Sequence, residues 1–361
     1  MDPSAHPYAV HQYDAQRIQA AHAVSADAAA LIAASDVVDL HLDTFIPPRL
    51  WGYDLTKRHG PGLLRGHFFG HLDFPRVLES GLSGAMWSIT TNVFRSKKGR
   101  LAVFERNLAR FRTVIGATRG RLRVVRTHGE YKAARAEGAH ACLVAIQGGN
   151  ALEASPDPAT TMGGFVTRVT LVHLTSSVYG TTSSPLAWRS RGKGLTDAGR
   201  ELVRALDEAR VFVDLAHINP EGFWDAVEAH DKTRPLVATH TGVSGVRPHW
   251  RNLDDAQVKA IADSGGVIGI IYATNFLRSK GGRKDGSLVV DHMDHVIRVG
   301  GEDCVAIGTD YDGMITPPTD LRDGTSYARL VQHMLDRGYS EARIQKILGG
   351  NFLRAFQALR P

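Results

Sequence analysis

Short apolar runs recur along the chain, and amphipathic stretches separate several of them. The apolar runs cover residues 37–43, 84–89, 141–146, 169–174, 211–215, 236–239, 266–271 and 304–308. Residues 101–115, 196–209 and 253–264 have the apolar spacing of helices that cover a core. Continuous apolar strands alternating with helices are typical of a parallel sheet covered by helices. About eight such strands favour closure, so we predict an α/β fold of the (β/α)8 TIM-like barrel type.

The two ends of the chain differ from this repeating pattern. Residues 1–20 are polar and predict a flexible N-terminal arm, whereas the alanine-rich residues 23–34 predict a helix. Asn252 is the predicted N-cap of the helix over 253–264. Residues 340–359 predict a helix–turn–helix pair. No Gly/Ser-rich linker or repeat divides the chain, so residues 21–361 are predicted to form a single barrel domain.

Charge and composition exclude several partners. Lys and Arg number 43 against 37 for Asp and Glu, a net charge of +6, and no basic tract stands out, so we expect no nucleic-acid partner. No apolar run approaches the roughly 20 residues of a membrane helix, so no membrane partner is expected. Cys142 and Cys304 lie in apolar runs and are predicted to be buried thiols. The N-terminus lacks the pattern of a secretion signal, which predicts a cytoplasmic location.

Histidines and acids stand at the ends of the apolar runs. They are His41, Asp43, His173, His217, His240 and Asp310. The carboxyl ends of barrel strands converge on one face, where active sites lie. One histidine at a strand end is usually structural, but four on separate strands, with acids beside them, predict a shared metal site. Imidazole and carboxylate ligands together suit zinc best, and manganese, iron and cobalt are alternatives.

The local spacing supports this interpretation. His41 and Asp43 are two residues apart, so both side chains can point to the same side of one strand. The polar segments 45–71 and 279–286 each follow a strand and are candidate active-site loops. We find neither a G-x-S-x-G nucleophile motif nor the glycine-rich fingerprints of nucleotide sites.

Several motifs, in one order along the chain, resemble the membrane dipeptidase (renal dipeptidase) family of zinc metallopeptidases. They include DLHLDTF, AIQGGNAL, DLAHINP, VATHTGVSGVRPHWRN and IGTDYDG, and the resemblance runs from about residue 37 to 356. It implies a metal-dependent hydrolase that cleaves the amide bond of dipeptides with metal-activated water. The partner would then be a dipeptide or another small molecule. Family members commonly pair, so the resemblance also implies a homodimer.

The resemblance also implies a role for each residue of the predicted site. His41 and Asp43 would hold one zinc ion, and His217 and His240 a second. His173 would lie beside the substrate carbonyl and its tetrahedral intermediate, and Asp310 would act as the acid and base. Arg251, eleven residues after His240, matches the position that binds the free carboxylate of the dipeptide, a task that suits a guanidinium fork.

The chain departs from the family at two positions in the third-strand motif. Gln147 stands where a glutamate bridges the two metals, and Asn150 where a histidine is frequent. A neutral amide offers one carbonyl oxygen and an NH₂ group that repels a cation. Three outcomes stay open. The site holds one ion on His41, Asp43 and another histidine, with or without Asp310; or it holds two, the second weakly, with Gln147 as a ligand; or hydrolysis is lost.

Two other functions therefore stand beside the dipeptidase hypothesis. The altered corner at Gln147 and Asn150, together with the long segment 45–71, fits an amidohydrolase that acts on a non-peptide amide or lactam. The loss of the bridging carboxylate fits a catalytically impaired homologue that binds a metal or ligand. Retained activity after Arg251→Ala would favour the amidohydrolase, and one confirmed turnover would exclude the impaired homologue.

Overall fold

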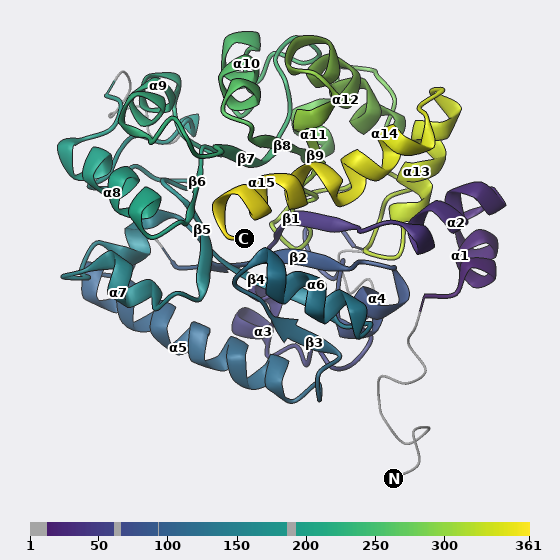
Figure 1. Cartoon of the computed structure of the whole chain (residues 1–361), viewed down its shortest axis with the longest axis horizontal. Coiled ribbons are helices and arrows are strands. Elements are labelled where there is room, and N and C mark those ends of the chain that lie inside the picture. Colours follow the sequence, from purple (N-terminus) through teal and green to yellow (C-terminus); the bar gives the residue numbers. More distant parts are fainter. Residues whose placement is uncertain (1–12, 61–65, 93, 186–192) are drawn as a thin grey trace.

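Eight parallel strands close into a barrel in the computed structural model, which describes residues 13–60, 66–92, 94–185 and 193–361 (Figure 1). Around the ring they are β1 (Val38–Leu42), β2 (Gly84–Thr90), β4 (His140–Gln147), β5 (Val166–Thr170), β6 (Phe212–Asp214), β7 (Val237–Thr241), β8 (Val267–Ile270) and β9 (Val305–Ile307). The barrel closes because β2 pairs with both β1 and β4, and β9 pairs with both β8 and β1. The predicted (β/α)8 fold is confirmed.

One short strand lies outside this ring and was not predicted. β3 (Leu122–Val124) pairs with residues 140–142 in the amino half of β4, while β5 pairs with residues 144–147 in its carboxyl half. β4 is thus long enough to have two neighbours on one edge. Three residues give too short an apolar signal to be recognised as a strand.

Helices surround the barrel on its outer side (Figure 1). The longer ones are α5 (Lys97–Gly116), α6 (His128–Ala136), α8 (Asp197–Glu208), α9 (Pro220–Ala229), α10 (Asp255–Asp263), α12 (Ser287–Gly300) and α13 (Tyr327–Asp336). Shorter helices are α3 (Ile46–Trp51), α4 (Phe74–Glu79), α7 (Pro158–Met162) and α11 (Thr274–Leu277), with 3-10 turns η2 (Gly149–Leu152) and η4 (Glu302–Cys304). α8 shows the principle, because Leu202, Val203 and Leu206 recur on one face and are buried.

The second half of the predicted N-terminal arm is helical. α1 (Ala15–His22) begins after Asp14, whose carboxylate accepts from the backbone N–H groups of Gln16 and Arg17, and it buries Ile18. α1 packs on α2 (Ala26–Ala34), which matches the predicted alanine-rich helix. The structure thus places residues 15–20 of the predicted arm in a packed helix, and residues 1–12 lie outside the described residues.

Two details of the predicted helices are corrected. α10 begins after Asp254, which forms a capping box with Gln257, while Asn252 instead holds its loop by donating to the carbonyls of Arg247 and Phe276. The C-terminal segment has no turn. α14 (Glu341–Gln345) continues through a π-helical segment, Lys346–Gly350, into α15 (Asn351–Leu359). The widened turn brings Gly349 against the backbone of Asp36, where a Cβ would lie 2.4 Å from the Asp36 oxygen.

The described residues agree with the prediction of two buried thiols. Both cysteines are free and buried. Among the described helices, none is both long and apolar enough to cross a membrane. The predicted loops are only partly described, since residues 61–65 of segment 45–71 are outside the described residues.

Candidate metal centre

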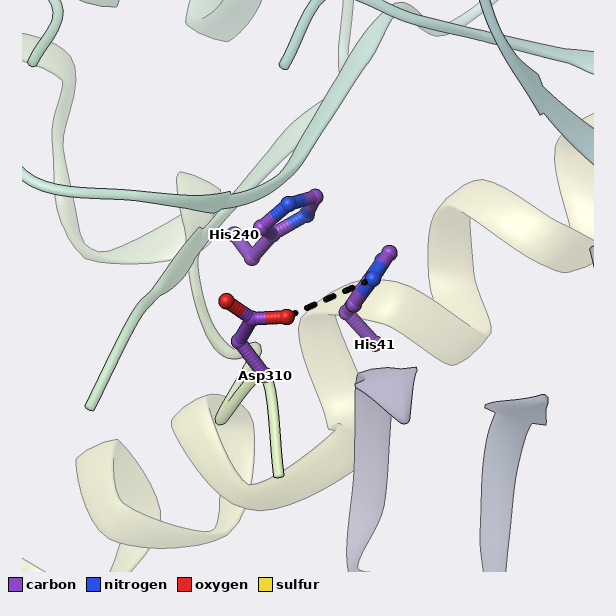
Figure 2. A group of neighbouring side chains, drawn as sticks. All are labelled: His41, His240 and Asp310. Carbon is purple, nitrogen blue, oxygen red and sulfur yellow. Dashed lines mark ion pairs between the residues drawn. The ribbon is translucent and has the colours of Figure 1, made fainter. Parts of the chain in front are cut away.

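The predicted site residues converge on the carboxyl ends of the barrel strands. His41 lies in β1 and His240 in β7, and Gln147 is the last residue of β4. The remaining predicted residues stand in the segments that follow β1, β5, β6, β7 and β9: Asp43, His173, His217, Arg251 and Asp310. Figure 2 shows three of the group, His41, His240 and Asp310, whose ligand atoms all lie within 4.8 Å of one another.

Short distances join the histidines and acids into one buried cluster. Nε2 of His41 lies 3.7 Å from Oδ1 of Asp43 and 3.6 Å from Oδ1 of Asp310. The rings of His41 and His240 are 3.6 Å apart at their centroids, and Nε2 of His240 is 2.9 Å from Nε2 of His217. The ring of His173 meets that of His217 edge-on at 4.6 Å. Residues from five strands therefore form one cluster.

Two members of the cluster have an unusual backbone. His217 has φ 68° and Asp310 has φ 63°, in the left-handed region that non-glycine residues rarely occupy. The surroundings hold both in place: the carbonyl of His217 accepts from the N–H of Ser183 at 2.7 Å, and the N–H of Asp310 donates to the His41 carbonyl at 3.1 Å. Such conformations occur mainly at sites where a side chain must be aimed against local preference.

The proton positions on His240 follow from its neighbours. The Thr239 hydroxyl donates to the Asp214 carboxylate at 2.7 Å, so its oxygen must accept the bond of 3.0 Å that it shares with Nδ1 of His240. Nδ1 therefore carries the proton and Nε2 is bare. A bare Nε2, oriented through a bond at Nδ1, is the state in which histidine binds a metal.

The surroundings of Nε2 of His240 also suit a cation. Two bare nitrogen lone pairs cannot stand 2.9 Å apart without repulsion, so a proton or a cation must lie between Nε2 of His217 and Nε2 of His240. Oδ1 of Asp310 is buried and has no hydrogen-bond partner among the described residues. The two imidazole nitrogens are donors that suit zinc, and the ligand atoms of His240 and Asp310 lie within 4.8 Å of each other, so the residues present fit such an ion.

Burial controls the protonation of the cluster. It lowers the pKa of His41, His217 and His240 well below the usual value, and that of His173 to about 4. Burial, followed by the nearby charge of Asp43, raises the pKa of Asp310 well above its ordinary value, and burial raises that of Asp43 to about 6. The imidazoles are thus neutral, and the two carboxyl groups are ones whose ionisation a cation would favour.

Arg251 lies at the edge of the cluster and has hydrogen-bond donors without a partner among the described residues. Its side chain is buried, one Nη group donates to the carbonyl of His240, and its Nε has no hydrogen-bond partner among the described residues. Burial lowers the pKa of Arg251 to about 10, while Asp310 opposes the shift. A buried guanidinium with an unused donor is suited to receive an anionic group of a ligand.

Sequence reasoning missed three charged residues next to the cluster. Arg168 in β5 and Asp214 in β6 form a fully buried ion pair at 3.1 Å, and Arg49 in α3 donates to the Thr90 carbonyl close to Asp43. Arg168 had a visible signal: it is an arginine within an otherwise uncharged strand, VTRVT. A charge in a strand buried along its whole length needs a partner inside the barrel.

Exposed apolar side chains follow the same ends of the strands. They are Leu50, Trp51, Phe68, Phe94, Leu174, Trp250 and Met314, all in segments that leave the carboxyl ends of barrel strands. Among the described residues, Trp224 on α9 is the one large exposed apolar side chain elsewhere. The rim of the site therefore offers apolar surface to whatever enters it.

The sequence model of the membrane dipeptidase family (peptidase family M19) matches residues 25–360. The chain belongs to the membrane dipeptidase family. The match covers nearly the whole chain and confirms the resemblance seen in the ordered motifs. The family of metallopeptidases implies a metal, and the cluster of His41, His240 and Asp310 is a candidate site for it.

Solved structures similar to this member of the membrane dipeptidase family include metallopeptidases. The dipeptidase AC is 29% identical, with a TM-score of 0.79 over 90% of this chain and 99% of its own. A Rhodobacter sphaeroides metallopeptidase, solved with a phosphinate mimic of the dipeptide L-Ala-D-Ala, is 27% identical with a TM-score of 0.76 over the same shares. The probable dipeptidase PvdM of Pseudomonas aeruginosa, 18% identical with a TM-score of 0.78 over 95% of this chain and 98% of its own, shares the fold.

A curated relative covers a smaller part of the chain. An uncharacterized Klebsiella pneumoniae protein from the pqqA 5′ region is 40% identical over 169 residues, which is 46% of this chain and 61% of that protein. The chain thus matches less than two thirds of that relative's length.

Proposed function

We propose that this protein is a zinc-dependent dipeptidase whose ion is held by Nε2 of His217 and Nε2 of His240, with Asp310 beside His240 as the acid and base. The bare Nε2 of His240, facing Nε2 of His217 at 2.9 Å, carries the proposal, because either a proton or a cation must lie between these two ring nitrogens. The Rhodobacter sphaeroides relative, solved with a dipeptide mimic, supports a dipeptide as the substrate.

A zinc ion at this position would polarise the scissile carbonyl and lower the pKa of an attacking water. The remaining steps belong to side chains. His173 carries on Nε2 a proton that points to Oε1 of Gln147, and it would turn this donor to the oxygen on which charge develops. Asp310 takes a proton from the attacking water at its unpartnered oxygen and delivers it to the leaving amine nitrogen.

Arg251 would bind the free carboxylate at the C-terminus of the dipeptide. Its unpartnered Nε and its remaining Nη hydrogens provide the parallel donors that a carboxylate accepts. The apolar rim favours substrates with apolar side chains, because polar groups there would lose water without gaining partners.

A panel of dipeptides with L- and D-configured C-terminal residues tests the proposal, with zinc-dialysed protein and release of free amine as the measurement. We expect turnover that a chelator abolishes and added zinc restores, with apolar dipeptides preferred. Matched dipeptide amides, which lack the C-terminal carboxylate, should be poor substrates. A panel left wholly untouched by zinc-loaded protein would rule out the dipeptidase.

The apolar rim also favours a second candidate, an amidohydrolase acting on a non-peptide amide or lactam with an apolar body. Such a substrate has no obligatory carboxylate for Arg251. In that case Arg251→Ala should keep its activity towards the natural substrate, whereas a dipeptidase should lose most of it.

A further inference from the structure

A buried cation lies inside the barrel, next to the histidine cluster. Arg168 lies in β5, and its side chain is fully buried. Its Nη1 pairs with Oδ2 of Asp214 at 3.1 Å, which balances the charge. A guanidinium in a protein stays protonated and offers donors without any acceptor. Every polar atom in hydrogen-bond contact with Arg168 must therefore accept.

One of these acceptors is Nδ1 of His41. Nη2 of Arg168 lies 2.9 Å from Nδ1 of His41 and 2.8 Å from the Ser88 hydroxyl oxygen, so its two hydrogens each have a target. A neutral imidazole has one nitrogen that donates and one that accepts. Since Nδ1 accepts, the proton of His41 is on Nε2, which is the atom that faces Asp43 and Asp310.

The side chain of Gln147 leads to the same proton position independently. The amide orientation that satisfies its surroundings donates from Nε2 to both oxygens of Asp43, at 2.9 and 2.8 Å. Its Oε1 then accepts from Nε2 of His41 at 3.1 Å and from Nε2 of His173 at 3.2 Å. These hydrogen bonds join His41, Asp43 and Gln147 into one corner of the site, and Nε2 of His41 is a donor in it.

His41 and His240 therefore occupy opposite tautomers. Thr239 accepts from Nδ1 of His240 and leaves Nε2 bare, whereas Arg168 donates to Nδ1 of His41 and leaves the proton on Nε2. A ring nitrogen that carries a proton has no lone pair for a metal. The zinc that the resemblance placed on His41 and Asp43 does not fit these residues.

We propose that Arg168 holds His41 in its Nε2–H tautomer, so that His41, Asp43 and Gln147 form a hydrogen-bonding corner and the chain binds a single ion, at His217 and His240. The inference rests on the proposed metal-dependent function and refines it. Arg168 is in this view a positioning residue that acts through His41. The corner also fixes His173, whose Nε2–H points to Oε1 of Gln147.

The full chain as it exists provides the first test. The protein is dialysed against excess zinc and then freed of loose metal, its zinc content is measured by elemental analysis, and the ions are located by anomalous diffraction. We expect about one ion per chain, on His217 and His240. Two tightly bound ions, or one ion on His41 and Asp43, would overturn the proposal.

The tautomer itself is observable in the unmodified chain. Long-range nitrogen–proton correlation spectra of protein labelled with ¹⁵N-histidine separate Nδ1–H from Nε2–H rings, and His41→Gln identifies the signal. The proton of His41 should stay on Nε2 both without metal and with zinc bound. An Nδ1–H signal for His41 in the zinc-loaded protein would contradict the proposal.

Paired variants separate Arg168 from Gln147. Gln147→Glu alone should still bind about one ion, whereas Arg168→Met/Gln147→Glu should bind about two, because His41 can then present a bare Nε2. Asp214 should tolerate the loss of Arg168, since its Oδ1 keeps the N–H groups of Ala216 and Thr239 at 3.1 and 3.0 Å. Arg204→Met/Gln147→Glu, which changes an exposed arginine of α8, is the matched control and should remain at one ion.

Two ions in Gln147→Glu alone, or one ion in a folded Arg168→Met/Gln147→Glu, would show that Arg168 does not determine how many zinc ions the chain binds. These readouts are independent of turnover. A protein that binds one zinc at His217 and His240 but cleaves no dipeptide refutes the proposed function alone, whereas a two-zinc dipeptidase refutes this inference alone.

Discussion

The two ends of the barrel bury histidines in opposite states. At the amino end of β4, His140 is fully satisfied: Nδ1 donates to the Leu82 carbonyl at 2.8 Å, and Nε2 accepts from the Trp87 indole at 3.1 Å. At the carboxyl ends, His217 has a buried Nδ1 without a partner among the described residues, and its Nε2 faces another imidazole. Burial is similar at both ends, so hydrogen-bond satisfaction distinguishes a structural histidine from a functional one.

The largest effect should come from removing a histidine of the cluster at the carboxyl ends of the strands. His240→Ala should lose zinc and reduce kcat/KM by more than about 100-fold, beyond the loss typical of changes outside the ligand shell. Elemental analysis and dipeptide kinetics measure both effects. His140→Gln, at the other end of the barrel, is the control and should keep zinc and turnover. Normal zinc content in His240→Ala would contradict the assignment of this site.

His140, whose two ring nitrogens are both hydrogen-bonded, should instead affect how the unfolding free energy depends on pH. Burial lowers the pKa of His140 to about 4, so the folded state resists a proton that the unfolded chain accepts near pH 6.5. Its contribution is therefore complete above about pH 6.5 and is lost as the pH falls towards 4, a change of up to about 3 kcal/mol.

Urea unfolding of the wild type and His140→Gln across this range measures the effect. The difference in unfolding free energy between the two proteins should shrink as the pH falls, because glutamine does not titrate. A difference that stays constant from pH 7 to pH 4 would mean that His140 takes up its proton at the same pH in the folded and the unfolded chain.

Arg251 tests whether the carboxyl end binds an anion. Arg251→Met should lower kcat/KM for free dipeptides by raising its activation free energy by about 2 kcal/mol, the value of a hydrogen bond to a charged group. The zinc content should stay unchanged. Dipeptide amides provide the comparison, because they lack the carboxylate and should lose much less. An equal loss for both substrates would place Arg251 outside the carboxylate site.

The smallest expected effect comes from a change that lowers the stability of the protein and leaves the chemistry of the site unchanged. Asp254→Ala removes the capping box of α10 and should lower the unfolding free energy by about 1 kcal/mol. Zinc content and kcat/KM should not change, because the cap does not contact the cluster. Asn252→Ala is a useful companion, since it disturbs the loop that holds Arg251 and should affect kinetics first.

The sequence alone determined the strand order and predicted which polar residues gather at the carboxyl ends of the strands. Eight apolar runs became the eight strands of the barrel, and a polar residue at the end of a buried strand can be read locally, as His41, His240 and Asp310 show. The shift of β5 to Val166–Thr170 and the helical Ala15–His22 were not readable, because local propensity is weak where packing decides.

Only the tertiary structure decided how the site residues bond. Arg168 and His41 are 127 positions apart, and their contact arises because β5 and β1 face each other across the closed barrel. The tautomer of His240 is set by the adjacent Thr239, but only because the distant Asp214 orients the Thr239 hydroxyl, and the left-handed backbone of His217 is held by Ser183. Hydrophobic periodicity records which face of an element is buried, but a proton's position is fixed by the particular donor or acceptor that the fold brings within hydrogen-bond distance.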